Sequence, residues 1–413
     1  MIKVLHLADT HLGTRQYGLE ERRRDFSRAF HQAIELAIEE GVAAVIHSGD
    51  LFDSRYPSTE DLRDALQGLI RLREAGIPFL GIVGNHEHKR GVQWLDLFAS
   101  LGLAVHLGLG LDLDIDSPGS QGEPYELGGL KIYGLDYAGR QEVKLPPLQQ
   151  GSVLVAHQLL DRVDPVRGEL KFAELRRSGA RLVLLGDYHE HRSFREEGLL
   201  VTYPGSTERW RASERGPRGC NLIDLETGRL ERRLLKTRKF IYIDQSEEAG
   251  ADHLLREIAA QGERLKGAVV CVYLRQVAAA RAAAEDSDSS PHSRAGRDRG
   301  LIREIEEAAL EGGALAVQVL QVAHRGPGVG SLDELEPPEE EPHLSVEVSE
   351  LGELLAQRLG ELELSPTARE IEAIIRDEKI ADSNVDPEVT KLLEGRELGL
   401  LDPNGSNEYR KEP

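Results

Sequence analysis

Five short apolar segments in the first half of the chain each end in a cluster of polar side chains, and this arrangement limits the fold more than any other feature. The segments cover residues 3–8, 42–47, 77–83, 152–156 and 181–185, and their length and composition are typical of buried strands. Helical patterns at 25–40 and 59–75 separate the first three segments. Alternating strands and helices predict an α/β layered fold with a largely parallel core sheet.

The polar clusters collect the side chains that a metal site requires. They are Asp9-x-His11, Gly49-Asp50, Gly84-Asn85-His86, His157 and Asp187-x-His189. In an open α/β sheet, ligands bind at the carboxyl ends of the strands, where these groups would meet. A single Asp or His at a strand end is usually a turn or loop residue, but five clusters in succession predict a shared site.

The residue types indicate which ions the site would hold and what they would do. Carboxylate, imidazole and amide ligands without thiolate suit divalent ions such as Mn²⁺, and also Fe, Zn or Mg. A carboxylate has two oxygens, so Asp50 could bridge two ions. Two ions about 3.5–4 Å apart polarise a phosphodiester, generate hydroxide at neutral pH and stabilise the leaving oxygen.

The charge of the chain is unevenly distributed. Of 413 residues, 72 are acidic and 51 are basic, which gives a net charge of −21. Residues 331–413 contain 23 acidic and 8 basic side chains, which leaves a net charge of only −6 for residues 1–330. A nearly neutral body can carry local basic patches that attract a polyanion, so the overall acidity does not exclude a nucleic acid partner.

Composition also limits the class of protein and its compartment. With 40% hydrophobic residues the chain can bury a core, which excludes disorder of the whole chain. Two cysteines, Cys220 and Cys271, are too few for a disulfide framework and indicate a reducing compartment. No apolar run approaches the roughly 20 residues that cross a membrane. We therefore expect a cytoplasmic protein with no membrane partner.

Four segments of different composition follow one another along the chain. Residues 1–238 contain the strand and helix alternation, and residues 239–325 repeat such a pattern on a smaller scale. A low-complexity stretch near 278–299, inside the second unit, is expected to be mobile. Residues 326–344 form a Gly/Pro/acidic linker, and residues 345–413 form an acidic tail with two short amphipathic helices.

Several motifs resemble those of a known family. Asp-Thr-His-Leu-Gly at 9–13, Ser-Gly-Asp-Leu-Phe-Asp at 48–53 and Gly-Asn-His-Glu at 84–87 are similar to motifs of the calcineurin-like metallophosphoesterases. Leu-Gly-Thr-Arg-Gln-Tyr-Gly at 12–18, Arg-Asp-Phe at 24–26 and Tyr-Pro-Gly-Ser-Thr-Glu-Arg at 203–209 narrow the resemblance to the SbcD-type double-strand-break repair nucleases. The resemblance implies a four-layer β-sandwich flanked by helices, a small α+β capping domain that binds DNA, and a helical C-terminal tail.

The resemblance also implies how the metal ligands are divided. One ion would be held by Asp9, His11, Asp50 and His189, and the other by Asp50, Asn85, His157 and Asp187. The family usually has Gly-His-x-His where this chain has Gly186-Asp187-Tyr188-His189-Glu190-His191, so His189 and His191 are the alternative last ligands.

Two further residues near the metals have roles that the resemblance implies. His86 would protonate the leaving 3′ oxygen or otherwise stabilise the departing group. The alternative is that His86 only orients Asp50 or Asn85. Asp53 stands where archaeal and eukaryotic relatives often carry a histidine, and it is either a supporting carboxylate near His86 or a plain helix-start residue.

Side chains close to two of the motifs are candidate DNA contacts. They are Arg15, Tyr17, Arg209 and Arg211. Guanidinium groups bind phosphate through paired hydrogen bonds, and a tyrosine beside them can stack or donate. The alternative is a solvated charged surface.

The function that the resemblance implies is a manganese-dependent DNA nuclease of the nucleoid, active in DNA repair, recombination and replication. It would act as an exonuclease on double-stranded ends and as an endonuclease on single strands or hairpins. The alternatives are a phosphomonoesterase or cyclic-nucleotide phosphodiesterase with the same metal core, and a catalytically weak scaffold that binds DNA ends.

The resemblance implies two protein partners. The chain has no Gly-x-x-x-x-Gly-Lys-Ser/Thr motif, so ATP would be used by a partner, the coiled-coil ABC-type ATPase SbcC, which would bind the tail. A homodimer would form through the helices at 59–75 and 92–101. The candidate contacts, which could instead be core residues, are Leu62, Leu66, Leu69, Trp94, Leu97 and Phe98.

Overall fold

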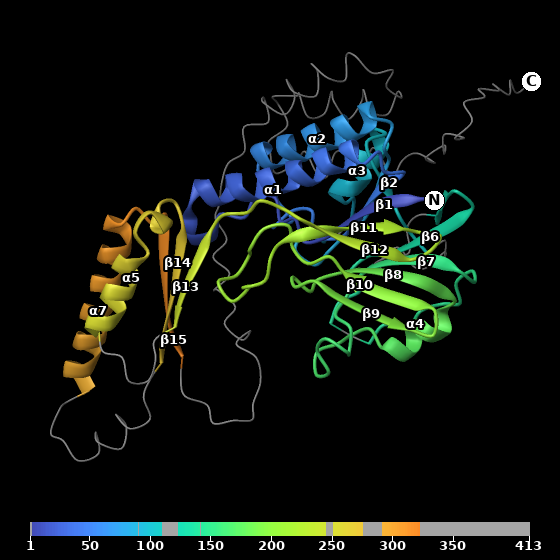
Figure 1. Ribbon diagram of the computed structural model, residues 1–413. Coiled ribbons are helices and arrows are strands. Elements are labelled where there is room, and N and C mark those ends of the chain that lie inside the picture. The colour runs from blue at the N-terminus through green and yellow to red at the C-terminus, as the bar shows by residue number, and fades with distance from the viewer. Residues whose placement is uncertain are drawn as a thin grey trace, which may run out of the picture.

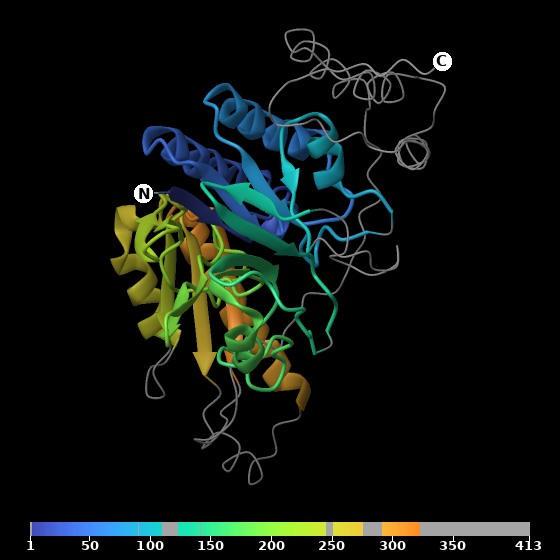
Figure 2. The same ribbon diagram turned by 90° about the vertical axis from the view of Figure 1, so that its right-hand side faces the viewer.

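Two six-stranded sheets stacked face to face form the larger part of the structure (Figures 1 and 2). The computed structural model describes residues 2–89, 91–109, 123–140, 142–244, 251–275 and 291–322. The first sheet, in spatial order, contains β12 (Arg229–Leu234), β11 (Gly219–Asp224), β1 (Lys3–Leu7), β2 (Ala44–Ser48), β3 (Phe79–Ile82) and β4 (Val105–His106). The second contains β5 (Tyr125–Leu127), β6 (Leu130–Leu135), β7 (Ser152–His157), β8 (Ala180–Gly186), β10 (Leu199–Tyr203) and β9 (Arg192–Glu196).

Helices cover the outer face of each sheet, so this unit has four layers. The first sheet is covered by α1 (Glu20–Glu39), α2 (Thr59–Glu74) and α3 (Trp94–Ser100), and the second by α4 (Phe172–Ser178). A short 3-10 turn, η1 (Gln16–Gly18), precedes α1. The predicted four-layer sandwich flanked by helices is therefore confirmed.

The central strands of both sheets run parallel. In the first sheet β1, β2, β3 and β4 pair in parallel, and in the second β6, β7, β8 and β10 do so. Antiparallel strands occur only toward the outside of these parallel runs, as in the pairs of β11 with β1 and β9 with β10. The carboxyl ends of the parallel strands therefore lie together, as the sequence pattern predicted.

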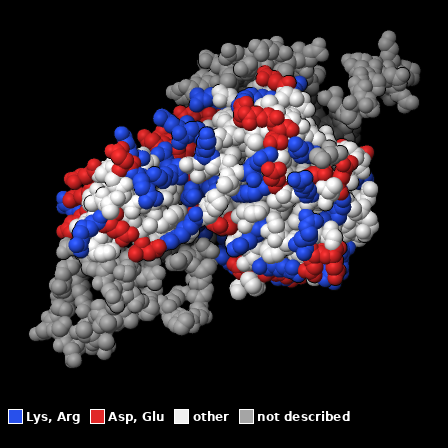
Figure 3. Space-filling model, in the orientation of Figure 1, with Lys and Arg blue, Asp and Glu red and all other residues white. Residues whose placement is uncertain are grey.

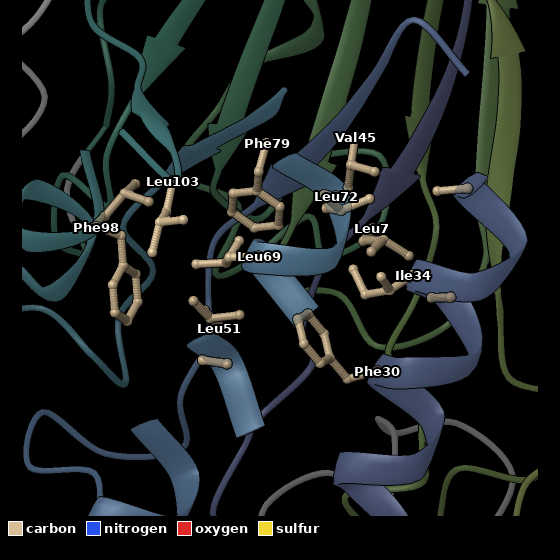
Figure 4. Packing of buried hydrophobic residues seen from close by; sticks show 14 of the residues in the cluster. Leu7, Phe30, Ile34, Val45, Leu51, Leu69, Leu72, Phe79, Phe98 and Leu103 are labelled. Carbon is tan, nitrogen blue, oxygen red and sulfur yellow. The ribbon is translucent and has the colours of Figure 1, made fainter. Parts of the chain in front are cut away.

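Two apolar layers hold the first sheet in place. Between the sheets, Val4, Ile46 and Leu80 of the first pack against Val155 and Leu184 of the second. On its other face the first sheet packs against α1, α2 and α3, and Figure 4 shows part of this layer. The labelled residues include Leu7, Phe30, Ile34, Val45, Leu69, Leu72, Phe79 and Phe98. All of these side chains are almost fully buried, and burial of this kind stabilises a fold by roughly 1.5–3 kcal/mol for each large side chain.

The candidate dimer contacts on α2 belong to this core. Leu62, Leu66 and Leu69 are at most 4% exposed and pack beneath the helix. The core alternative left open by the sequence is the correct one for these three residues, because α2 needs them to bury its apolar face against the sheet.

The first helix begins earlier than the sequence pattern indicated. It starts at Glu20 rather than at residue 25, with acidic side chains in its first turn. Asp25 lies inside the helix, where it is buried and accepts hydrogen bonds from Arg22 and Arg238. Because Arg238 lies beyond the last strand of the first sheet, this pair also ties α1 to the segment that leads into the next unit.

The second unit is a three-stranded sheet of β13 (Phe240–Asp244), β14 (Val269–Arg275) and β15 (Ala316–Val322), all parallel. It also contains α5 (Ala251–Ala260), the 3-10 turn η2 (Gly262–Leu265) and α7 (Pro291–Glu311). Both helices pack on one face of the sheet (Figure 1). We refer to this unit as the capping domain. The helix α7 starts within the stretch that we expected to be mobile, and proline is well suited to its first position.

The expected linker at 326–344 and the tail at 345–413 lie outside the described residues. Among the described helices, none combines the length and the apolar character that crossing a bilayer requires.

We predict that Gly68→Ala destabilises the first unit. A Cβ atom on Gly68 of α2 would lie 2.4 Å from Cε1 of Phe30, so α1 and α2 would have to move apart or Phe30 would have to leave its position. We expect a loss of about 1–3 kcal/mol from overpacking in urea denaturation followed by circular dichroism. In Gly300→Ala, where nothing lies within 4 Å of the new Cβ, stability should stay equal or rise. Equal stability of Gly68→Ala and wild type would contradict the close approach of the two helices.

Candidate metal centre

The seven predicted ligands come together at the carboxyl ends of five strands. They follow β1, β2, β3, β7 and β8, and they are Asp9, His11, Asp50, Asn85, His157, Asp187 and His189. Four of them have backbone φ angles in the left-handed region: 52° at Asp9, 43° at His11, 57° at Asp50 and 84° at Asp187. Left-handed backbone in a non-glycine residue persists where the surrounding structure enforces it, and it is concentrated at functional sites.

The glycines of the motifs leave room for the ligands. A Cβ atom on Gly84 would lie 2.1 Å from Oδ1 of Asp50, and Cβ atoms on Gly49 and Gly186 would lie 2.5 and 2.6 Å from Nδ1 of His157. Each of these three glycines therefore allows a ligand side chain to pack directly against a neighbouring backbone. This contact explains why glycine precedes the Asp or Asn in three of the five clusters.

His11 and His189 face each other in one half of the site. Their Nε2 atoms are 3.2 Å apart. Nδ1 of His189 donates to Oε1 of Glu214 at 2.6 Å, and Nδ1 of His11 lies 3.2 Å from Oδ1 of Asp53. With the proton of each neutral ring on the Nδ1 atom beside a carboxylate, both Nε2 atoms would present lone pairs to the same space. Two opposed acceptors need a cation or a proton between them.

His157 lies at the centre of the other half. Its Nδ1 atom donates to the backbone carbonyl of Ser48 at 2.7 Å, so its Nε2 atom is directed into the site as an acceptor. That atom lies 2.9 Å from Oδ1 of Asn85, 3.3 Å from Oδ2 of Asp50 and 3.9 Å from Oδ1 of Asp187. Three oxygens and one imidazole nitrogen form a donor set that fits a divalent cation.

Asp50 and Asp9 connect the two halves. Oδ2 of Asp50 is 3.8 Å from Nε2 of His11 and 3.3 Å from Nε2 of His157, so one oxygen reaches both halves. Asp9 accepts the backbone N–H of Asp187 on Oδ1 at 3.0 Å. Its other oxygen, Oδ2, is buried and has no hydrogen-bond partner among the described residues. A buried carboxylate oxygen without a partner is costly, and a metal ion would satisfy it.

The pKa values of the side chains in the site reflect how closely their charged groups are packed. Burial alone would raise the pKa of the Asp50 carboxyl, but His157, His86 and His11 hold that pKa far below its usual range. Burial alone would lower the pKa of His189, but the Glu214 carboxylate raises it to about 9. The pKa of His157 is likewise held well above its usual value against the effect of burial, mainly by Asp50. In the metal-free protein, protons are held by these histidines. Metal ions would displace those protons on binding, because histidine binds a metal in its neutral form.

His86 lies at the edge of this cluster. Its backbone N–H donates to Oδ1 of Asp50 at 3.0 Å, and its Nδ1 atom is 3.2 Å from the carbonyl oxygen of Asp53. Its ring makes an edge contact with His11 at a centroid distance of 4.8 Å. The side chain is 27% exposed, so the ring is both held in place and open to solvent.

The two alternatives for the last ligands differ in where the structure places them. Asp187 and His189 lie in the site, whereas Nδ1 of His191 is directed at the carbonyl oxygen of Tyr203, 2.9 Å away.

The sequence interpretation did not assign roles to three supporting residues. Glu87 is buried and accepts the backbone N–H groups of Phe52 and Gly84, which joins two of the ligand loops. Burial, together with the Asp50 charge, raises the pKa of Glu87 to about 7. Trp210 and Glu214 come from the segment after the Pro-Gly-Ser motif. Glu87 belongs to the recognised Gly-Asn-His-Glu motif. For Trp210 and Glu214, the sequence offered no signal beyond a single tryptophan in a charged segment.

Asp53 is a supporting carboxylate in the structure. It accepts the indole N–H of Trp210 on Oδ1 at 2.8 Å, and the same oxygen is 3.2 Å from Nδ1 of His11 and 3.8 Å from Nδ1 of His86. These contacts correspond to the role of a supporting carboxylate near His86 and not to that of a plain helix-start residue.

Two of the candidate DNA contacts lie between the domains. Arg209 donates to the carbonyl oxygens of Glu214, Gly216 and Arg238. Tyr17 packs in an apolar cluster with residues of the capping sheet, and its hydroxyl group is buried. These contacts give both residues a structural role in this conformation.

The other two candidates are more accessible. Arg15 lies 3.4 Å from Glu20 and 3.5 Å from Glu60, and its side chain is 35% exposed. The guanidinium carbon of Arg211 lies 4.7 Å from the centre of the Trp210 ring, beside the metal ligands. Figure 3 shows basic and acidic side chains interspersed over one face of the molecule, with basic ones gathered where α1 meets the capping domain.

Comparison with known proteins identifies the class. Residues 2–220 match the calcineurin-like phosphoesterase family. The chain therefore belongs to this family of phosphate ester hydrolases that use divalent metals.

Relatives that match nearly the whole of this chain narrow the family assignment further. The chain is 35% identical over 408 residues to "DNA double-strand break repair protein Mre11" of Haloferax volcanii, covering 95% of this chain and 82% of that protein. It is 33% identical over 412 residues to the Mre11 protein of Halobacterium salinarum, covering 95% and 94%. The Mre11 protein of Methanosarcina mazei is 35% identical over 418 residues, and the chain spans 60% of its length. The chain belongs to the Mre11/SbcD family, and membership of the bacterial SbcD branch stays a prediction.

An ionic cluster outside the metal site supports the strand that carries Asn85 and His86. Nδ1 of His106 is 2.6 Å from Oδ1 of Asp96, and its Nε2 atom is 3.0 Å from Oδ1 of Asp136. Asp136 also accepts the backbone N–H of Val83 at 2.8 Å, at the end of β3. Burial alone would lower the pKa of His106, but Asp136 and Asp96 hold it well above its usual value.

We predict that His106→Gln destabilises the protein most in mildly acidic solution. The folded pKa of His106 exceeds its unfolded value, so its stabilisation is complete below about pH 6.5 and is lost as pH rises through the folded pKa. The free energy of unfolding of variant and wild type, measured by urea denaturation of metal-free protein, should differ most near about pH 6 and converge toward alkaline pH. A difference that grows with rising pH would show that His106 is neutral in the folded protein.

Proposed function

We propose that this chain is a DNA nuclease that hydrolyses phosphodiesters with two divalent ions, and we expect both ions to be Mn²⁺. The observation that carries the proposal is the convergence of seven donor side chains from five strand ends, with Oδ2 of Asp50 at 3.8 Å from His11 and 3.3 Å from His157. Further support comes from the relatives, which are named as DNA double-strand break repair proteins. We propose exonuclease action on double-stranded ends and endonuclease action on single strands or hairpins.

The residues suit such a pair of ions. We propose that Asp9, His11, Asp50 and His189 hold one ion and that Asp50, Asn85, His157 and Asp187 hold the other. When bound, the ions supply charge that polarises the phosphodiester and activates a water molecule for attack. The donor set is rich in carboxylate, and Asp187 replaces a histidine of the family pattern, which favours harder ions such as Mn²⁺ or Mg²⁺.

His86 is the proposed proton donor to the leaving oxygen. The Asp53 carbonyl oxygen accepts a hydrogen bond from Nδ1 and keeps the ring in one orientation, so the proton for the leaving group is carried on Nε2. Partial exposure of the ring gives a DNA strand access to it.

We predict that His86→Gln loses cleavage of linear duplex DNA by about 10²–10⁴-fold while Mn²⁺ binding is retained, because only proton transfer is removed. His88→Gln is the matched control, since His88 lies two residues further on and outside the ligand clusters of the described residues. Hydrolysis of p-nitrophenyl phosphate is measured beside DNA cleavage. Rapid turnover of the monoester with intact DNA would favour a phosphomonoesterase instead, and full DNA cleavage by His86→Gln would remove its proposed role.

Arg211 is the proposed DNA contact closest to the metals. Its guanidinium group covers Trp210, its Nε atom has no hydrogen-bond partner in the described part of the chain, and a phosphate beside the site would supply one. We also propose that Arg15, Tyr17 and Arg209 contact DNA. Tyr17 and Arg209 would have to leave their present contacts to do so.

We predict that Arg211→Glu weakens duplex DNA binding in low salt and lowers the dependence of affinity on salt, by about one unit of slope for each phosphate that is no longer bound. Arg177→Glu, the same change at a 71% exposed arginine on α4, serves as the control. Fluorescence anisotropy in Ca²⁺, which avoids cleavage, measures both. Equal affinity of Arg211→Glu and wild type at every salt concentration would remove Arg211 from the DNA interface.

We also propose the partners that the sequence implies. An ATPase of the SbcC type would bind the acidic tail at 345–413, and two copies of this chain would associate. The buried leucines of α2 do not provide the dimer contact, so a dimer would use other parts of its surface.

A further inference from the structure

Trp210 donates two hydrogen bonds to two different carboxylates beside the metal ligands. Its indole Nε1–H donates to Oδ1 of Asp53 at 2.8 Å, and its backbone N–H donates to Oε2 of Glu214 at 2.9 Å. Each carboxylate faces one of the opposed histidines: Asp53 lies against His11, and Glu214 against His189. Trp210 therefore orients the two carboxylates, and each carboxylate in turn orients one of the two histidines.

The ring of Trp210 also contacts these histidines directly. It stacks on His11 at a centroid distance of 5.5 Å and an interplanar angle of 24°, and it makes an edge contact with His189 at 5.5 Å. The other half of the site is supported differently, because His157 is oriented by the backbone of Ser48. Trp210 also makes an edge contact with His86 at a centroid distance of 5.3 Å. Among the described residues, its ring contacts thus lie on His11, His189 and His86 and not on His157.

The capping domain holds the segment that carries Trp210 and Glu214. The hydroxyl group of Tyr273 donates to the carbonyl oxygen of Ala212 at 3.1 Å, and that of Tyr242 lies 3.3 Å from the carbonyl oxygen of Glu214. Arg215 makes two hydrogen bonds of 2.9 Å to the carboxylate of Asp244. The guanidinium group also lies over both tyrosine rings, at 4.8 and 4.7 Å.

We propose that residues 210–215 are a positioning segment, through which the capping domain sets the geometry of His11 and His189 and so the affinity of one of the two metal positions. Trp210 and Glu214 act through the histidines and do not touch the reacting atoms. The inference rests on the proposed two-metal function, and it assigns the capping domain a task other than the DNA binding that the family resemblance implies.

The first test removes the indole N–H and keeps an aromatic ring. In Trp210→Phe, titration with Mn²⁺ followed by electron paramagnetic resonance should show one metal site weakened by about 10–100-fold and the other unchanged, as for loss of groups that orient ligands. Trp94→Phe is the matched control, because Trp94 donates to the carbonyl oxygen of Arg55 through the same indole atom. If Trp210→Phe folds poorly by circular dichroism, Glu214→Gln tests the same half of the site with a residue of equal size.

The outcomes separate this inference from the function on which it rests. Wild type that binds two Mn²⁺ ions, with Trp210→Phe unchanged or weakened equally at both sites, overturns the positioning role and leaves the nuclease proposal intact. Wild type that binds no pair of ions overturns the proposed function itself.

The second test breaks the contact with the capping domain. Arg215→Gln should weaken the same metal site as Trp210→Phe, by several-fold, and Arg215→Lys should restore part of the affinity because it keeps the ion pair with Asp244. Arg303→Gln, which removes an exposed ion pair with Glu307 on α7, is the control within the capping domain. Unchanged metal affinity in Arg215→Gln would show that the capping domain does not act on the site through this segment.

Discussion

The crowding of carboxylate, imidazole and amide groups at the ends of five strands is the constraint that this structure has to accommodate. His11 and His189 face each other with Nε2 atoms 3.2 Å apart, and His157 faces three side-chain oxygens. Folding brings these groups together, and without a metal ion they pair with one another through hydrogen bonds and close contacts between histidine and carboxylate. The strands, the left-handed residues at their ends and the glycines that precede the ligands all serve to hold that arrangement, and its donor set fits divalent ions.

The two halves of the site depend on different parts of the chain. His157 and Asn85 are held by strand ends, by the backbone of Ser48 and by the His106 cluster, which are all parts of the rigid sandwich. His11 and His189 depend in addition on a segment without regular structure, which contacts the capping domain. A movement of that domain would therefore affect His11 and His189 before it affects His157 and Asn85.

The arginines show why DNA contacts are hard to assign from sequence. A guanidinium group has the same five donors whether it binds a phosphate or a backbone carbonyl oxygen. Arg209 and Arg211 are two residues apart, yet the first binds carbonyl groups between the domains and the second lies over Trp210 beside the metals. Only the folded backbone decides which acceptor is within reach.

The sequence by itself predicted the layered α/β fold from its strand and helix patterns, and its motifs indicated the family and a set of candidate metal ligands, because such patterns and motifs are local properties of the chain. It left open whether His191 binds metal and whether the leucines of α2 are core, and it did not indicate roles for Trp210 and Glu214. These depend on contacts between residues far apart in the chain, such as Trp210 with Asp53 and Glu214 with His189. Such pairings have no local signal, since they arise only when the two sheets and the capping domain are packed together.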